Sequence, residues 1–281
     1  MKKLFLLFLF CNLAISSFAL GVGDLFIQGS RFWQNNVFVN LLKQDKIFAD
    51  FVFNLTEHKD INDKIFAFHL PIGTKLSIFN FTLDPFWYPN TSGDAYAYGG
   101  SLKIESLFRS DYVNNNYASG YFKASFANQR ADISRGGTPN KENFKQLVFE
   151  GGLNIDFANL YIFNINGNIF TYPDEVKDIT SFGGIMNQND LADLGTIDYI
   201  LAFPHFSAGG GITWISRENN TKTSLSYRYI NYEHDLIAHS VMIQTLIPIS
   251  ENLLAKLIYN HLFETHHHNK DLFGIGLNYL F

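Results

Sequence analysis

Apolar and polar residues alternate with a period of two along most of this chain, and this pattern constrains the fold more than any other feature. In residues 95–109, Tyr98, Leu102 and Phe108 fall on one parity, whereas Lys103 and Glu105 fall on the other. Successive side chains of a β-strand point to opposite faces, so such a segment is predicted to be a strand with one apolar and one polar face. The same alternation predicts strands at 117–132, 145–157, 159–172, 221–233, 238–249, 252–264 and 272–281, with weaker ones at 47–57, 64–70, 75–84 and 203–216.

Strands of this kind fit either a soluble sandwich or a membrane barrel whose apolar faces meet lipid. The apolar parity is dominated by Phe, Tyr, Leu and Ile, without the mix of sizes that a packed sandwich core needs. The strand length matches a tilted bilayer crossing, and a closed barrel pairs every backbone group that lies in lipid. No run of eighteen apolar residues follows residue 19, so no transmembrane helix is predicted. These features favour the membrane barrel.

The connections between the predicted strands alternate between short and long. Tight turns are predicted at 71–74, 157–159, 217–220 and 249–252, and longer or more polar connections at 58–63, 85–94, 133–144, 174–202 and 265–270. Transmembrane barrels have short periplasmic turns and longer outer loops. The predicted fold class is therefore all-β, a single antiparallel transmembrane β-barrel of about 12 strands over residues 47–281, with both ends on the periplasmic side. Residues 20–46 are left open as a periplasmic segment, a plug in the lumen, or an extra hairpin that would raise the count to about 14.

The first nineteen residues have the features of a secretory signal peptide. Two lysines precede an apolar run that ends at Phe10, and small residues lead to Ala19. This order predicts a signal peptide at residues 1–19, because the apolar run is too short to cross a bilayer. The only cysteine, Cys11, lies in this segment, so the mature chain is expected to have no disulfide and no thiolate metal site.

The charge balance argues against a nucleic-acid partner. The chain has 21 Lys and Arg residues against 26 Asp and Glu residues, which gives a net charge of −5, and it has no basic run. Proteins that bind nucleic acids depend on cations that neutralise phosphates. We therefore expect no nucleic acid among the partners.

The last strand carries a resemblance to a known class. Its alternating residues end the chain and comprise Phe273, Ile275, Leu277, Tyr279 and Phe281. This ending resembles the C-terminal strand of bacterial outer-membrane β-barrel proteins, which finish in an aromatic residue after alternating apolar positions. The resemblance covers this strand closely and the remaining strands only as a general pattern. It implies an outer-membrane location and recognition by the barrel-assembly machinery.

Charged residues of both signs fall on the predicted lumen face. The candidate constriction comprises Lys103, Glu105, Lys123, Glu150, Arg228 and Lys256, and Asp50, Asp84, Asp156 and Lys222 share the same face. The first four of these lie on three consecutive strands, where they can pair across neighbours. Two interpretations remain open: a charged constriction that selects solutes, or a salt-bridged network that fills a narrow barrel.

A weak candidate for catalysis follows the longest predicted loop. His205 and Ser207 share a strand face, and a serine nucleophile needs a base within hydrogen-bond reach. The pair resembles part of the dyad of outer-membrane phospholipases, which are also twelve-stranded, and implies a lipid hydrolase. The sequence departs from that pattern, because Ala208-Gly209 follows where the phospholipases have Asn-Gly, and no third residue is evident to orient the histidine.

A histidine cluster is the weak candidate for a metal site. His266, His267 and His268 are adjacent in a predicted outer loop, with His261 nearby. Imidazoles bind Zn²⁺, Cu²⁺ or Ni²⁺, but adjacent loop residues rarely converge on one ion. We expect no structural metal and no cofactor.

The sequence therefore favours a non-enzymatic outer-membrane channel that passes small polar solutes passively. A first alternative is an occluded barrel whose outer loops meet partners at the surface. A second alternative is a lipid hydrolase that uses His205 and Ser207. The expected partners are the outer-membrane lipid bilayer, the barrel-assembly machinery and small polar solutes.

Overall fold

The computed structural model of the chain contains one antiparallel sheet of seventeen strands. It describes residues 21–29, 32–43, 46–58, 63–89, 96–111, 116–135, 138–173, 179–187, 197–200, 204–232, 237–265 and 270–280. The strands are β1 (Gly21–Gly29), β2 (Phe32–Lys43), β3 (Ile47–His58), β4 (Asp63–His69), β5 (Ile72–Leu76), β6 (Phe79–Tyr88), β7 (Tyr96–Asp111), β8 (Asn116–Arg135), β9 (Thr138–Phe157), β10 (Tyr161–Thr171), β11 (Ile179–Asn187), β12 (Ile197–Ile200), β13 (Pro204–Ile215), β14 (Lys222–Tyr232), β15 (Ile237–Ser250), β16 (Leu253–Glu264) and β17 (Lys270–Leu280). The described residues contain no helix long and apolar enough to cross a membrane.

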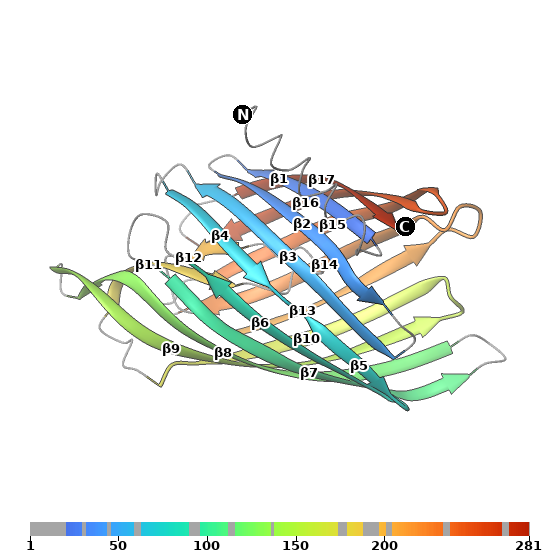
Figure 1. Ribbon diagram of the computed structural model, residues 1–281, viewed down its shortest axis with the longest axis horizontal. Coiled ribbons are helices and arrows are strands. Elements are labelled where there is room, and N and C mark those ends of the chain that lie inside the picture. Colours follow the sequence, from blue (N-terminus) through green and yellow to red (C-terminus); the bar gives the residue numbers. More distant parts are fainter. Residues whose placement is uncertain are drawn as a thin grey trace.

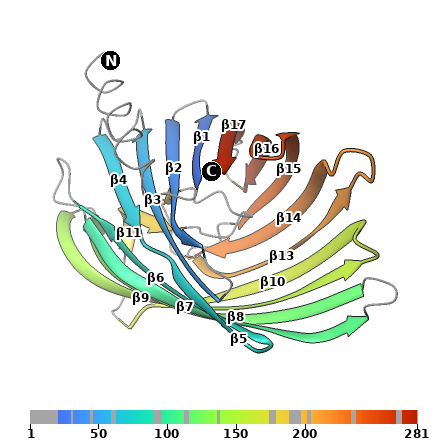
Figure 2. The ribbon, with the colours of Figure 1, turned by 45° about the vertical axis from the view of Figure 1, so that its right-hand side comes forward.

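The sheet closes into a barrel because its first and last strands pair. Gly21 lies opposite Leu280 and Gly29 opposite Leu272, so β1 and β17 are in register over the whole length of β1. Strands β4 and β5 both pair with β3 and with β6, so together they form one strand of the wall. Strands β11 and β12 form a hairpin beside the wall, where β11 pairs with the end of β8, and β10 pairs directly with β13. The described wall therefore has 14 strands, and Figures 1 and 2 show them tilted around one lumen.

The expected count of about twelve strands is corrected to the alternative of 14, because residues 21–43 form the hairpin β1–β2 in the wall. Two of the lumen-facing side chains of β1 are Leu25 and Ile27, 2% and 1% exposed, whereas Asp24 shares the outer parity with Phe26. The alternation of β1 is therefore not the apolar-out, polar-in pattern on which the prediction relied. The described wall includes β1, which begins at Gly21.

A second correction concerns the turn predicted at 71–74. Leu70 and Pro71 interrupt the wall strand between β4 and β5, and the chain continues in the same direction. Because proline has no N–H to donate, it breaks the ladder at that point. The reversal lies at Ser77 and Ile78, so β6 extends to Tyr88 within the segment predicted as an outer loop.

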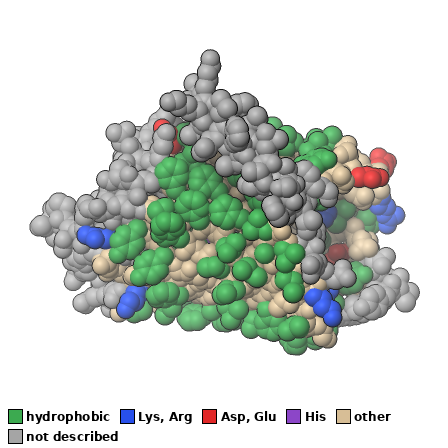
Figure 3. All heavy atoms as spheres, in the orientation of Figure 1, with side chains coloured by type: hydrophobic (Ala, Val, Ile, Leu, Met, Phe, Trp, Pro, Cys, Tyr) green, Lys and Arg blue, Asp and Glu red, His purple; other side chains and the backbone are tan. Residues whose placement is uncertain are grey.

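The outer face of the wall is apolar. Large apolar side chains on the outward parity are exposed along the wall, among them Trp87 at 56%, Phe122 at 51%, Ile165 at 62% and Phe273 at 60%. Figure 3 shows hydrophobic side chains across the middle of the described wall, with charged side chains towards its two ends. Such a surface is stable only against lipid, so the wall of the barrel lies in a bilayer.

Short turns gather at one rim of the barrel, which we call the turn rim; it also holds Gly21 and Leu280. The described turns of this rim join β5 to β6, β9 to β10, β13 to β14 and β15 to β16. All the described non-glycine residues with positive φ lie in these turns: Ser77, Ala158, Asn159 and Asn220. Two-residue turns with positive φ match the right-handed twist of antiparallel strands. The turns predicted at 157–159, 217–220 and 249–252 are confirmed.

The lumen contains two apolar clusters that the alternation did not predict. Ala67, Phe86, Tyr88, Ala97 and Ala127 form one of them. Leu25, Ile27, Met242 and Ile258 form the other, with Phe38 and Leu272 packed against it. Between the clusters the inward parity of β7–β10, β13 and β14 is mostly polar. Inward polar side chains also come from β2, β3 and β15, among them Gln34, Asn54 and Ser240.

Candidate functional site in the lumen

Three charged residues lie side by side on the lumen face of β7, β8 and β9. Lys103 is the cross-strand partner of Lys123, and Lys123 is the partner of Glu150. Directly opposite residues in antiparallel strands are close enough for their side chains to interact. The sequence prediction that charged residues of three consecutive strands meet is therefore realised in the structure.

Glu150 is held by two neighbours from β8. Lys123 Nζ lies 3.8 Å from Glu150 Oε2. The hydroxyl of Tyr121 donates a hydrogen bond to Glu150 Oε1. The carboxylate is only 5% exposed, so these contacts offset the cost of removing its charge from bulk water.

Tyr121 also contacts the neighbouring lysine on β7. Lys103 Nζ lies 4.6 Å from the centroid of the Tyr121 ring, a cation–π geometry. The same ammonium lies 3.8 Å from Glu105 Oε2, whose other oxygen accepts a hydrogen bond from Ser119 at 3.5 Å. One tyrosine therefore joins the two lysines and Glu150 into a charged group on β7–β9.

A glycine makes room for that tyrosine. Gly152 is the cross-strand partner of Tyr121, and a Cβ at Gly152 would lie 2.3 Å from Tyr121 Cε1. The ring thus lies across the space that any larger residue would occupy. Gly152 is a functional-site residue that sequence reasoning missed.

Arg228 occupies the other side of the polar region, on β14. Its Nη2 donates to Asn166 Oδ1 at 3.4 Å, and the residue is 6% exposed. Its cross-strand partner is Gly209 on β13, where a Cβ would meet Tyr227 O at 2.9 Å. Gly211 is similar, since a Cβ there would lie 2.8 Å from Leu225 O, so both glycines let the backbones of β13 and β14 approach closely beside Arg228.

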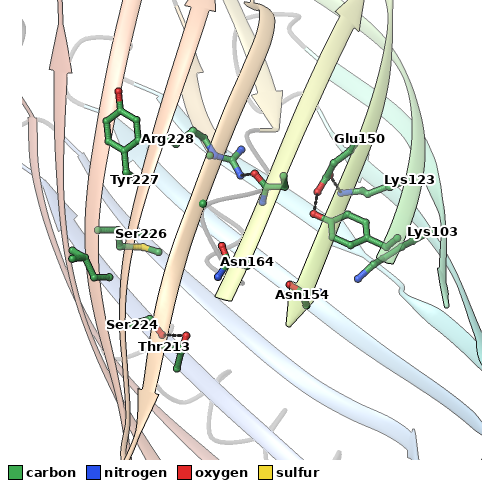
Figure 4. A pocket seen from close by; sticks show the side chains of 16 residues that line it. Lys103, Lys123, Glu150, Asn154, Asn164, Thr213, Ser224, Ser226, Tyr227 and Arg228 are labelled. Carbon is green, nitrogen blue, oxygen red and sulfur yellow. Dashed lines mark hydrogen bonds and ion pairs between the residues drawn. The ribbon is translucent and has the colours of Figure 1, made fainter. Parts of the chain in front are cut away.

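Between Arg228 and the charged group on β7–β9 lies a cavity of about 460 Å³. Its described lining includes Lys103, Tyr121, Lys123, Glu150, Asn154, Asn164, Asn166, Gly209, Thr213, Ser224, Ser226 and Arg228. Figure 4 shows the two charged sides flanking a floor of amide and hydroxyl side chains, with Thr213 and Ser224 hydrogen-bonded at 2.8 Å. Long charged side chains thus surround a floor of small polar ones, and this leaves room for a solute. We call this cavity the lumen pocket.

The other predicted constriction residue lies away from this cavity. Lys256 is on the inward parity of β16, opposite Gly276 and Leu246, and it does not line the lumen pocket. The six predicted constriction residues therefore do not form one ring. Five of them, from Lys103 to Arg228, belong to or adjoin the pocket.

The two residues of the hydrolase alternative differ in their surroundings. Ser207 is 4% exposed, and its Oγ accepts a hydrogen bond from Asn168 Nδ2 at 3.0 Å. His205 is exposed at a β-bulge between Pro204 and Phe206, which disturbs the alternation that would place it beside Ser207. The structure shows Asn168 as the hydrogen-bond partner of Ser207.

The remaining sequence candidates are the histidine cluster and the assembly strand. His266 and His268 fall outside the described residues, and no group of three or more potential metal ligands occurs within the part of the chain that is described. Of the assembly strand, Phe273, Ile275, Leu277 and Tyr279 face outward with exposures of 42–60%, and Phe281 lies outside the described residues.

A second polar group in the lumen was not predicted. His69 Nδ1 lies 3.3 Å from Asp84 Oδ2, and His69 Nε2 lies 3.1 Å from the Tyr88 hydroxyl. Asp84 was expected on the lumen face, but His69 lies at the end of a weak strand and Tyr88 in a predicted loop. The alternation gave no signal for either.

Comparison with known proteins places the fold in the outer-membrane β-barrel class. The sequence matches no family model and no curated protein. The toluene transporter TodX of Pseudomonas putida is similar in structure, with a TM-score of 0.50 and 10% sequence identity over 95% of this chain and 93% of that one. The NanC porin has a TM-score of 0.49 and 9% identity over 94% of this chain and all of its own. At such low identity the likeness to TodX bears out the predicted fold class alone, and not an activity.

Proposed function

We propose that this protein is a passive channel in the bacterial outer membrane that admits small polar solutes. The observation that carries the proposal is the lumen pocket, a cavity of about 460 Å³ lined by charged, amide and hydroxyl groups inside a closed barrel. A lumen packed for structure alone would fill that space with side chains, because proteins rarely leave large voids in their interiors. Polar side chains here surround the space instead.

The direct test is single-channel conductance of the refolded mature protein in a planar bilayer. We expect discrete current steps that are stable over a range of voltage. The controls are the same bilayer with no protein and with heat-unfolded protein. Absence of steps from a protein whose folding is shown by heat-dependent mobility in SDS gels would exclude an open pore.

The occluded barrel is supported by a separate observation and remains the second candidate. Several inward side chains of β2, β3, β15 and β16 are almost inaccessible, including Gln34 and Ser240 at 0% and Asn260 at 1% exposure. Together with the apolar clusters, they narrow the path through the lumen. In this case the folded protein would be silent in the bilayer, and its function would lie in the outer loops.

We further propose that the C-terminal strand directs assembly. Four outward residues of β17 are apolar and exposed, and the aromatic Phe281 follows them. In cells, Phe281→Ala is expected to lower the amount of folded barrel in the outer membrane severalfold, whereas refolding of the purified variant into detergent should be unchanged. Equal loss in both assays would indicate a folding defect rather than lost recognition by the assembly machinery.

A further inference from the structure

The lumen pocket has an excess of positive charge in a chain that is acidic as a whole. The chain carries a net charge of −5. The described lining of the pocket nevertheless contains Lys103, Lys123 and Arg228 against one carboxylate, Glu150. Counting Glu105 as well, which lies 3.8 Å from Lys103 Nζ, still leaves cations in excess.

The single carboxylate of the lining is also the least available to a solute. Glu150 is 5% exposed and is engaged by Tyr121 and Lys123. Lys103, in contrast, has a side chain that is 37% exposed, and it approaches Glu105 and the Tyr121 ring without being covered by them. The charge that a solute meets first on this side of the pocket is therefore positive.

The floor of the pocket supplies neutral hydrogen-bonding groups at close spacing. Asn154, Asn164, Asn166, Thr213, Ser224 and Ser226 come from adjacent strands and present amides and hydroxyls. Such groups bind hydroxyls as well as they bind water, since each can donate and accept. Cations at the sides and these groups on the floor match a molecule with one anionic group and several hydroxyls.

We propose that the lumen pocket is a binding site for small polyhydroxylated carboxylates and makes the channel anion-selective. Lys103, whose side chain is exposed, would attract the carboxylate directly. Arg228 is 6% exposed and bonded to Asn166, so it would add positive potential from the opposite side, and the amide and hydroxyl floor would replace the solute's hydration shell. This inference rests on the proposed channel function for its consequence in transport, but binding itself can be measured without a current.

Two measurements separate the site from the channel. The first is isothermal titration of the detergent-folded barrel with gluconate, and with sorbitol as a six-carbon polyol that lacks the carboxylate. The second is the reversal potential in a potassium gluconate gradient across a planar bilayer. We expect gluconate to bind and sorbitol to bind at least fivefold more weakly, since one unit charge near a cation in water-like surroundings is worth about a fivefold change. We also expect the reversal potential to indicate anion preference.

Variants assign the effect to the pocket. Lys103→Gln and Arg228→Gln are each expected to weaken gluconate binding about fivefold and to shift the reversal potential towards cations. Glu105→Gln removes a neighbouring carboxylate. It should therefore strengthen gluconate binding and shift the reversal potential towards anions. Arg217→Gln is the matched control, because it removes the same charge from an exposed position in the turn between β13 and β14, outside the pocket, and should have little effect.

Each outcome decides between the two proposals. A conducting barrel that is cation-selective, or that binds sorbitol as tightly as gluconate, would overturn the anion site and leave the channel standing. A silent barrel that binds gluconate through Lys103 and Arg228 would support the site and overturn the channel. A folded barrel with neither binding nor current would overturn both.

Discussion

At the scale of single residues, the lumen pocket depends on one glycine whose neighbour provides an internal control. In Gly152→Ala the new Cβ would lie 2.3 Å from the Tyr121 ring, whereas in Gly151→Ala it would meet only Tyr121 O at 3.9 Å. We expect Gly152→Ala to displace the ring and weaken its contacts with Glu150 and Lys103. The free energy of unfolding in urea should fall by about 1–3 kcal/mol, with noisier open-channel current.

The control variant, Gly151→Ala, makes the same glycine-to-alanine change on the outward face of the strand. Gly151→Ala should leave both the urea midpoint and the current unchanged, because the outward position opens to lipid and the nearest atom is at ordinary contact distance. If the two variants behave alike, the Tyr121 ring is not held across Gly152 as described. The position of one Cβ is the only difference between them.

The geometry around Ser207 predicts the absence of hydrolase chemistry. Its hydroxyl accepts from Asn168 in a buried pair, and His205 is exposed at a bulge. Ser207→Ala should therefore lower stability by about 1 kcal/mol through the lost hydrogen bond and change no lipid hydrolysis. Phospholipid hydrolysis is measured on both proteins in mixed micelles. Activity in the wild type that disappears in the variant would restore the catalytic alternative.

At the scale of strands and turns, the β9–β10 turn has a conformation that suits Asn159 but that Ala158 does not favour. Ala158 and Asn159 have φ values of 55° and 53°, and Leu160 N donates to Phe157 O at 3.0 Å, as in a type I′ turn. Left-handed φ costs alanine about 1–2 kcal/mol, part of which glycine recovers. Ala158→Gly should thus stabilise the barrel by about 0.5–1 kcal/mol in urea unfolding. Glu251→Gly, in a turn of the same rim without positive φ, should give no gain; equal stabilisation would contradict the turn assignment.

The strands differ in how closely they follow the alternation of the sequence. Strands such as β10, where Phe163 and Ile165 face lipid and Asn164 and Asn166 face the lumen, follow the alternation closely. Strand β1 does not, because Leu25 and Ile27 pack inside the lumen and Asp24 takes the outer parity. Alternation predicts which faces are opposite, but only the closed barrel decides which face is inside.

The sequence predicts which charged residues belong to the candidate site, but it does not predict the shape of the lumen pocket. Lys103, Lys123 and Glu150 stand on the polar parity of consecutive strands, so their proximity follows from pairing. The register that places Tyr121 against Gly152 depends on turn lengths and could not be read from alternation. For the same reason Arg228, five strands from Lys103 around the wall, could be placed on the lumen face but not across one cavity from it.

At the scale of the whole molecule, closure between β1 and β17 removes the exposed edges of the sheet. Every residue from Gly21 to Gly29 has a partner on β17, and β1 has a second ladder with β2. In a bilayer an unpaired strand edge leaves several backbone groups without hydrogen bonds, at a cost of several kcal/mol for each group. The barrel therefore cannot be stable in a bilayer unless β1 and β17 pair.

This condition predicts how the barrel responds to truncation. A chain that starts at Ala19 or Leu20 keeps β1 and β2 and should refold into detergent micelles, with the strand signal in circular dichroism and the heat-dependent mobility of a closed barrel. A chain that starts at Lys46 retains every strand predicted in the twelve-strand interpretation. It lacks the partner of β17, which is β1, and one partner of β3, which is β2. Because twelve strands with this register cannot close without shifting the pairing of the remaining wall, we expect the shorter chain to aggregate and to show no heat-dependent mobility. If it refolds as well as the longer chain, β1 and β2 are not required for closure.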